Sequence, residues 1–167
     1  MTATMGAADF AWADALRKKH YPAEKNQLPA HITLFHHLPP QGLNEITSLV
    51  KKTTQDHCSP QCTLADVMQF DEGVAYKLHS PQLLELRRFL GASFHGLLVQ
   101  QDQQEPRLHI TVQNKADPGV GKKLFRELSA QFEPRAFEIT GLGLHYYMDG
   151  PWQEIGSWRF RGKSRYS

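Results

Sequence analysis

The chain has 167 residues, of which 40% are hydrophobic and 22% are charged, and its formal net charge is +2 at pH 7. This composition predicts one globular domain over residues 1–167, and it argues against a dedicated nucleic-acid coat. No apolar run reaches the length of a membrane span and no secretory pattern begins the sequence, so we expect a cytoplasmic protein with no membrane partner. The two cysteines, Cys58 and Cys62, match no redox or zinc spacing, and we expect reduced thiols.

The first half of the chain predicts alternating helices and strands. In chain order, the expected elements are a helix over residues 9–19, a strand over 31–36, a helix over 44–55, a hairpin of strands 62–70 and 74–78, and a helix that begins at Pro81. Asp9 is the expected cap of the first helix, and Asp71-Glu72-Gly73 is the expected hairpin turn. Residues 1–6 are weak strand material.

A polar, glutamine-rich segment over residues 100–106 marks the boundary between the halves, and the pattern then repeats. The second half predicts a strand over 108–112, a helix over 118–131, a strand over 136–146, a turn at Asp149-Gly150-Pro151 and a last strand through Phe160. Each half thus contains a strand, a helix and a hairpin. The sequence therefore predicts a duplicated, bilobal α+β fold, in which two antiparallel-sheet lobes with outer helices flank a central cleft about a pseudo-two-fold axis.

One short motif occurs once in each half of the chain. His31-Ile32-Thr33-Leu34 recurs as His109-Ile110-Thr111-Val112. Because side chains alternate across a strand, the His and Thr of each copy share one face and the two aliphatic residues share the other. We therefore expect both aliphatic pairs in the core and both His-Thr pairs at the cleft.

Two histidines and two threonines support acid–base chemistry at a phosphodiester. An imidazole titrates near neutrality, so His31 and His109 can divide the roles of base and acid, although the sequence does not show which serves as which. The hydroxyls of Thr33 and Thr111 are neutral donors suited to phosphate oxygens. This chemistry calls for no metal and no cofactor.

The doubled motif resembles that of the 2H phosphoesterase superfamily, particularly its bacterial branch named for 2′-5′ RNA ligase. Further similarity lies in Leu28-Pro29-Ala30, Leu38-Pro39-Pro40, Gly73-Val74-Ala75-Tyr76 and Gly150-Pro151-Trp152. The resemblance implies a metal-independent, bilobal enzyme that hydrolyses 2′,3′-cyclic phosphates to 2′-phosphates or makes and breaks 2′-5′ linkages in RNA. Its partners would be RNA ends or small cyclic-phosphate nucleotides. Tyr146 stands where we expect many relatives to offer an arginine.

Further candidates for contacts with a base or with the substrate are Phe35, His37, Arg107, Tyr146 and Trp152. Aromatic rings can stack on unpaired nucleobases, and a cation beside the second motif could meet phosphate. Each candidate also has a structural interpretation, which is core packing for the aromatic residues and an exposed strand end for the others.

Two other classes of function remain open. A catalytically silent RNA- or nucleotide-binding module would keep the fold without turnover, and Tyr146 is its best argument. A metal hydrolase would use the motif histidines as ligands, but zinc enzymes usually need a third protein ligand and none is obvious. We expect a monomer.

Overall fold

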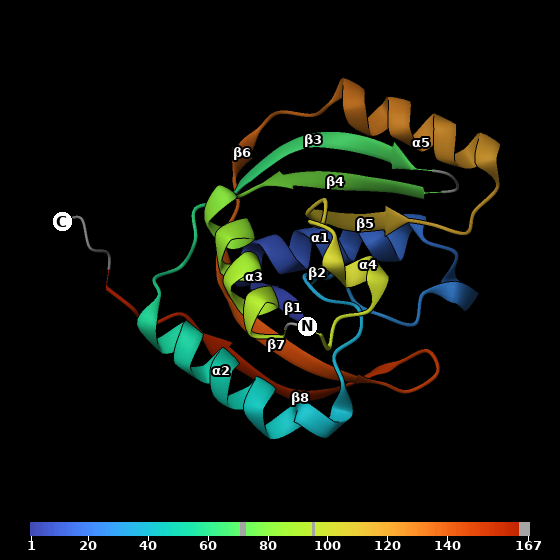
Figure 1. The fold of residues 1–167 in the computed structure, drawn as a ribbon. Coiled ribbons are helices and arrows are strands. Elements are labelled where there is room, and N and C mark those ends of the chain that lie inside the picture. The colour runs from blue at the N-terminus through green and yellow to red at the C-terminus, as the bar shows by residue number, and fades with distance from the viewer. Residues whose placement is uncertain (71–72, 95, 164–167) are drawn as a thin grey trace.

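The computed structural model describes residues 1–70, 73–94 and 96–163, and its strands form two four-stranded antiparallel sheets (Figure 1). Sheet A contains, in spatial order, β2 (Ile32–Thr33), β1 (Thr2–Met5), β7 (Ile139–Tyr147) and β8 (Trp152–Arg159). Sheet B contains β5 (His109–Gln113), β4 (Gly73–His79), β3 (Thr63–Phe70) and β6 (Arg135–Ala136). With the helices packed against them, the two sheets confirm the predicted α+β class.

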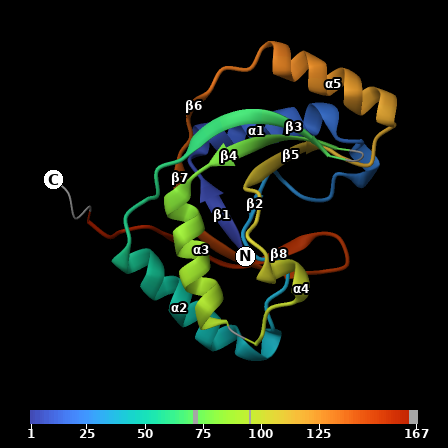
Figure 2. The ribbon, with the colours of Figure 1, turned by 45° about the horizontal axis from the view of Figure 1, so that its top comes forward.

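Helices cover the outer face of each sheet. The helices of the described residues are α1 (Ala7–His20), α2 (Leu43–Asp56), α3 (Pro81–Ser93), α4 (Gln100–Gln103) and α5 (Pro118–Ala130), with 3-10 turns at Ala23–Lys25 and Pro40–Gly42. Helices α1 and α5 pack on sheet B, while α2 packs on sheet A with α3 beside it (Figures 1 and 2). Within the described ranges, no helix combines the length and the apolar character needed to cross a bilayer.

Local sequence explains where two of these helices begin. Ser80 accepts a hydrogen bond from the Leu83 N–H at the start of α3, and Asp117 accepts one from the Gly119 N–H at the start of α5. Proline follows each cap, at a position where its missing N–H costs nothing. The start of α3 therefore lies where the sequence predicts it.

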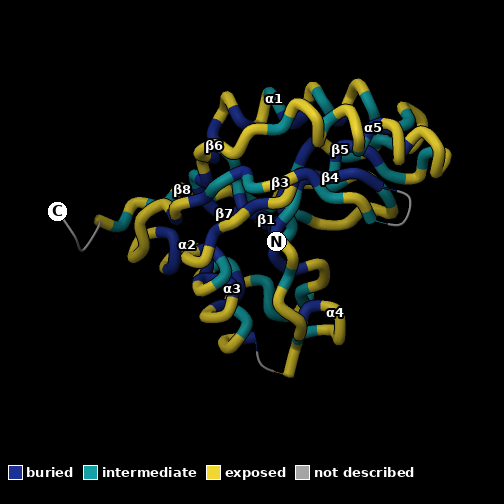
Figure 3. The backbone as a smooth tube through the Cα atoms, turned by 90° about the horizontal axis from the view of Figure 1, so that it is seen from above, coloured by how far each residue is buried: buried dark blue, intermediate teal, exposed yellow. Residues whose placement is uncertain are grey.

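Each sheet turns one apolar face toward its helices. Ile32 and Leu34 are buried while Thr33 between them is partly exposed, and Ile110 and Val112 flank Thr111 in the same way. Buried positions follow the strands, and exposed positions lie on the outer turns of α5 (Figure 3). The predicted alternation in both motifs is thus confirmed.

The two halves of the chain exchange strands. The β3–β4 hairpin of the first half pairs with β5, which carries the second motif. The β7–β8 hairpin of the second half pairs with β1, which in turn pairs with β2 and the first motif. Each sheet therefore takes its motif strand from one half and its hairpin from the other.

The N-terminal region departs from the sequence prediction. Residues 2–5 form β1, which lies inside sheet A between β2 and β7. The expectation of weak strand material is wrong because pairing on both sides supplies what local propensity lacks. Helix α1 begins at Ala7, and Asp9 is not its cap. Instead, the Asp9 carboxylate accepts hydrogen bonds from the Glu138 N–H and from Arg135.

Two other segments differ from the sequence prediction, and a third predicted segment lies partly outside the described residues. Strand β2 spans two residues rather than residues 31–36, because the N–H groups of Leu34 and Phe35 both turn to the Met1 carbonyl. The segment expected as a polar boundary contains α4, whose Asp102 is buried. Two residues of the expected hairpin turn, positions 71 and 72, lie outside the described residues.

Candidate active site

The fold brings the two motifs to one site between the sheets. His31 and Thr33 belong to sheet A and its entry, and His109 and Thr111 lie on β5 of sheet B. Strands β2 and β5, which hold or directly follow these residues, contact each other from the two sheets. We refer to these four residues as the motif site.

Both motif histidines are held in the same tautomer by the same bond. Nδ1 of His31 lies 2.8 Å from the Pro29 carbonyl oxygen, and Nδ1 of His109 lies 2.6 Å from that of Arg107. A carbonyl oxygen only accepts, so Nδ1 carries the proton in each ring. Nε2 is thereby left to take or give a proton, and both motifs present this nitrogen through matching backbone contacts.

His31 is poised in its neutral form. Burial lowers its pKa to about 4, and the charges of Arg17, His109 and His145 act in the same direction. The bond to the Pro29 carbonyl opposes this shift without cancelling it. At neutral pH the His31 imidazole is therefore uncharged and able to accept a proton.

The motif threonines lie beside small neighbours. Thr33 is the register partner of Thr2 on β1, and Thr111 is the partner of Ala75 on β4. Within residues 1–70, 73–94 and 96–163, no hydrogen bond of the structure uses either motif hydroxyl. Both hydroxyls are therefore available to donate to a ligand oxygen.

An aromatic ring accompanies each motif histidine. The Trp152 ring centroid lies 4.7 Å from that of His31, and the Phe70 centroid lies 6.0 Å from that of His109. Both aromatic residues come from the end of a hairpin strand. Gly73 makes the second arrangement possible, since a Cβ there would overlap the Phe70 ring. Trp152 is thus the one aromatic candidate from the sequence that the structure places against a motif histidine.

Phe35 lies away from the motif site. Its side chain is 1% exposed and packs against Phe94 at a centroid distance of 5.6 Å, with the Arg87 guanidinium 4.4 Å from its ring centre. Because the chain leaves the strand after Thr33, the alternation that predicts Phe35 on the motif face no longer applies. The interpretation as a stacking platform is wrong, and core packing is what the structure shows.

The remaining sequence candidates lie at the periphery. His37 is exposed, and its N–H donates to Asp102. The Arg107 side chain is exposed, although its carbonyl orients His109. Tyr147, not Tyr146, is the register partner of Trp152, so Tyr146 lies on the opposite face of sheet A. Tyr146 is therefore not a substitute for an arginine at the motif site.

The sequence misses one buried cation that connects both motifs. Arg17 is 4% exposed, and its Nε donates to Asn26 Oδ1 at 2.8 Å and to the Leu28 carbonyl at 2.9 Å. Its Nη1 donates to the Thr111 carbonyl at 2.9 Å. One guanidinium thus ties the loop before the first motif to the second motif strand.

His145 and Thr2 are two further residues that the motif pattern does not reveal. Nε2 of His145 lies 3.1 Å from Thr2 Oγ1, and its ring stacks on Trp152 at a centroid distance of 5.1 Å. Burial lowers the pKa of His145. The alternation of β7 is the signal that could have found it, since Leu142 and Leu144 are buried and His145 turns the other way.

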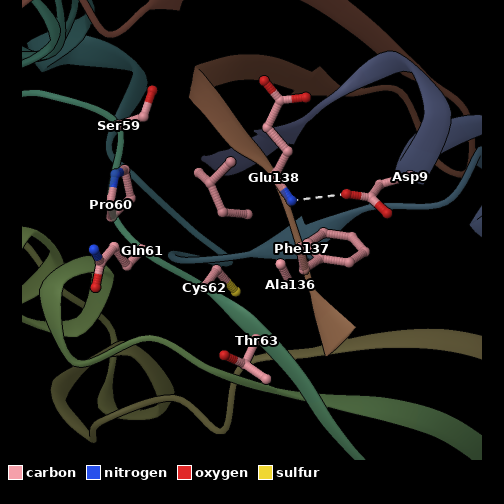
Figure 4. A pocket seen from close by; sticks show the side chains of 10 residues that line it. Asp9, Ser59, Pro60, Gln61, Cys62, Thr63, Ala136, Phe137 and Glu138 are labelled. Carbon is pink, nitrogen blue, oxygen red and sulfur yellow. Dashed lines mark hydrogen bonds between the residues drawn. The ribbon is translucent and has the colours of Figure 1, made fainter. Parts of the chain in front are cut away.

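A cavity of about 570 Å³ lies elsewhere, at the edge of sheet B opposite β5 (Figure 4). It is lined by Asp9, residues 59–63 and residues 136–139, and by none of the motif residues. Burial raises the pKa of the Cys62 thiol there to about 11, so it stays protonated at neutral pH. The Asp9 carboxylate is already bonded to Arg135 and the Glu138 N–H. Among the described residues, no three His, Cys, Asp or Glu side chains cluster closely enough to hold a metal ion.

The chain is similar to known proteins in sequence and in fold. A family model described as the 2'-5' RNA ligase superfamily matches residues 6–151, which include both motifs. The crystal structure of TT0787 of Thermus thermophilus is similar, with a TM-score of 0.63 and 17% sequence identity, over 98% of this chain and 97% of that chain. At this identity the structural similarity shows a shared fold. No curated protein matches the sequence.

Proposed function

Because this chain belongs to the 2'-5' RNA ligase superfamily, we propose that it is a phosphodiesterase acting on RNA-type 2′,3′-cyclic phosphates or 2′-5′-linked ribonucleotides. His31 and His109 form the acid–base pair, and no metal ion takes part. The observation that carries the proposal is the matched pair of Nδ1–carbonyl bonds, which leave Nε2 of both histidines for chemistry.

His31 is the base in this mechanism. Its lowered pKa keeps Nε2 unprotonated at neutral pH, so it can take the proton of an attacking water. The water oxygen bonds to phosphorus as the bond from phosphorus to the 3′ oxygen breaks. His109, in its protonated form, gives a proton to that leaving oxygen, and the product is a 2′-phosphate.

The motif threonines stabilise the charge that develops on phosphorus. Their hydroxyls donate to the non-bridging oxygens, one from each sheet, so the phosphate is held between the two histidines. An oxygen that gains charge in the transition state gains most from donors already in place.

Hydrolysis of the four nucleoside 2′,3′-cyclic monophosphates and of a 2′-5′-linked diribonucleotide, with EDTA present, tests the proposal. We expect His31→Ala and His109→Ala each to lower kcat by about 10²–10⁴-fold. His57→Ala, which removes an exposed histidine at the end of α2, is the matched control and should leave activity unchanged. For the wild type, kcat/KM should decrease as the pH falls through about 4, because His31 takes up a proton there.

The same panel separates this enzyme from the other classes. Activity that EDTA abolishes and added metal restores would contradict two-histidine chemistry. Binding of these ligands without turnover, in wild type and variants alike, would instead identify a catalytically silent nucleotide-binding module.

A further inference from the structure

We infer that Trp152 and His145 are positioning residues for His31, acting through a continuous stack that is anchored on β1. This inference rests on the proposed function for its kinetic consequence, but the arrangement itself is a property of the free protein. We call Thr2, His145, Trp152 and His31 the Trp152 stack.

The stack is continuous from the centre of sheet A to the first motif. The Trp152 indole lies 4.7 Å from the His31 ring, at an interplanar angle of 52°, and 5.1 Å from the His145 ring, at 28°. His145 Nε2 lies 3.1 Å from Thr2 Oγ1. Thr2 is paired with Thr33 on one side and with Gly143 on the other, so the anchor belongs to an interior strand.

Gly143 leaves room for the anchoring bond. A Cβ at this position would lie 3.2 Å from His145 Nε2 and 3.2 Å from Thr2 Oγ1. These distances are tighter than ordinary van der Waals contact, so a side chain at position 143 would press on both partners. The backbone of β7 is therefore compatible with the stack because position 143 carries no side chain.

His31 needs such support more than His109 does. His31 precedes a strand of two residues, whereas His109 begins a strand of five. Each ring has one Nδ1 bond to a carbonyl, and that bond alone still allows the ring to tilt. Trp152 contacts the His31 ring more closely than Phe70 contacts the His109 ring, and it fixes this tilt.

The surroundings of His31 agree with this role. The charged and titratable groups that act on it are Arg17 from α1, His109 from β5 and His145 from β7. The N-terminal ammonium of Met1 and Glu154 from β8 act in turn on His145, in opposite directions. Burial is the largest cause of the low pKa of His31, and the indole of Trp152 supplies part of that burial. Because Trp152 already contacts two imidazoles, we assign it to His31 and not to a nucleobase.

Histidine-ring NMR titration of the free protein is the direct test. In the wild type we expect His31 to keep one tautomer, protonated on Nδ1, and to titrate near pH 4. Trp152→Leu keeps apolar bulk but removes the ring, so it should raise this midpoint by at least about one pH unit and mix the tautomers. Thr2→Val keeps the shape of Thr2 and removes only its hydroxyl, so it should shift His31 in the same direction by less. Phe70→Leu is the matched control. It removes the ring that lies against His109, so it should change the chemical shifts of the His109 ring and leave the His31 titration unchanged.

Kinetics distinguish positioning from substrate binding. With a nucleoside 2′,3′-cyclic phosphate, Trp152→Leu and Thr2→Val should lower kcat, by about tenfold for Trp152→Leu, and leave KM within about threefold. An unchanged His31 titration in both variants would overturn the inference, as would a higher KM at unchanged kcat, which would make Trp152 a base contact. If the wild type shows no turnover, the proposed function fails, while the NMR titration still decides the role of the stack.

Discussion

At the scale of single residues, Arg17 has contacts that link both motifs. Its buried guanidinium donates hydrogen bonds to the Asn26 side chain, the Leu28 carbonyl and the Thr111 carbonyl. Removing it leaves three acceptors without their donor, and unsatisfied buried acceptors cost free energy. We therefore treat Arg17 as a structural requirement of the motif site.

Replacement of Arg17 by Met should lower the free energy of unfolding by about 2–4 kcal/mol, because the apolar side chain satisfies none of the three acceptors. Urea denaturation at pH 7 measures this. Lys18→Met is the matched control, since the Lys18 side chain is 73% exposed in its pair with Asp14 and should cost less than about 1 kcal/mol. Arg17→Lys should not restore stability, because an ammonium lacks the planar fork. Equal losses at positions 17 and 18 would contradict this assignment.

The motif residues could be predicted from sequence, whereas Arg17 could not. Polar and aliphatic residues alternate through both motifs, so the sequence predicts which face of the strand each side chain occupies. Burial in the structure follows the same alternation at His31, Thr33, His109 and Thr111. Arg17 stands in a basic run at the end of α1, where solvent exposure is the ordinary expectation. Its partners come from a loop and from a distant strand, and no local pattern encodes them.

At the scale of elements, β2 is so short that the chain after the first motif must be held by contacts outside the sheet. Asp102 of α4 provides these contacts. Its carboxylate accepts hydrogen bonds from the N–H groups of His36 and His37, and it lies 3.0 Å from His36 Nδ1. Although burial alone raises the pKa of Asp102, the bonds from His36 and His37 hold it below its usual value. A four-residue helix thus fixes the exit of β2.

Replacement of Asp102 by Asn should lower the free energy of unfolding by about 1–3 kcal/mol at pH 7, because a neutral amide with one oxygen cannot serve all these donors. A carboxyl whose pKa is lowered on folding stabilises the protein above its unfolded pKa, and this contribution is lost as pH falls through the folded pKa. Urea denaturation from pH 7 down to pH 3 should therefore show the difference shrinking below about pH 4.

Asp117→Asn is the matched control for this change. It alters an exposed cap of α5, where Asn caps nearly as well as Asp, so its effect should stay below about 0.5 kcal/mol. A difference at position 102 that does not depend on pH would show that its carboxylate charge plays no part.

The elements that sequence patterns missed are the ones made by tertiary contacts. Apolar periodicity predicted α2 and the β3–β4 hairpin, because each has enough residues for a period to show. Strand β1 has only four residues, most of them small, and it exists through pairing with β2 and β7. Helix α4 lies in a polar segment, and Asp102 connects it to the rest of the fold by accepting from the His36 and His37 N–H groups and, at its carbonyl, from Arg87.

At the scale of the whole molecule, the duplicated pattern predicts two sheets but not how the halves share them. A repeat in sequence leaves open whether each motif strand shares a sheet with the hairpin of its own half or with that of the other half. The structure has the second arrangement, in which β4 pairs with β5 and β1 pairs with β7. Strand pairing between distant segments is decided by packing, which a single sequence does not display.

This exchange predicts that neither half folds alone. Residues 1–104 contain β4 without its partner β5, and residues 105–167 contain the β7–β8 hairpin without its partner β1. Each fragment therefore exposes a sheet edge and an apolar face. We expect each fragment alone to lack a cooperative urea transition and near-ultraviolet circular dichroism, and the mixed fragments to recover both. The break falls between Gln104 and Glu105, which are exposed, and the full chain cut there by a protease after folding should remain native-like. A cooperative transition in either fragment alone would mean that a half-chain builds its own core, and the two sheets would then be independent lobes.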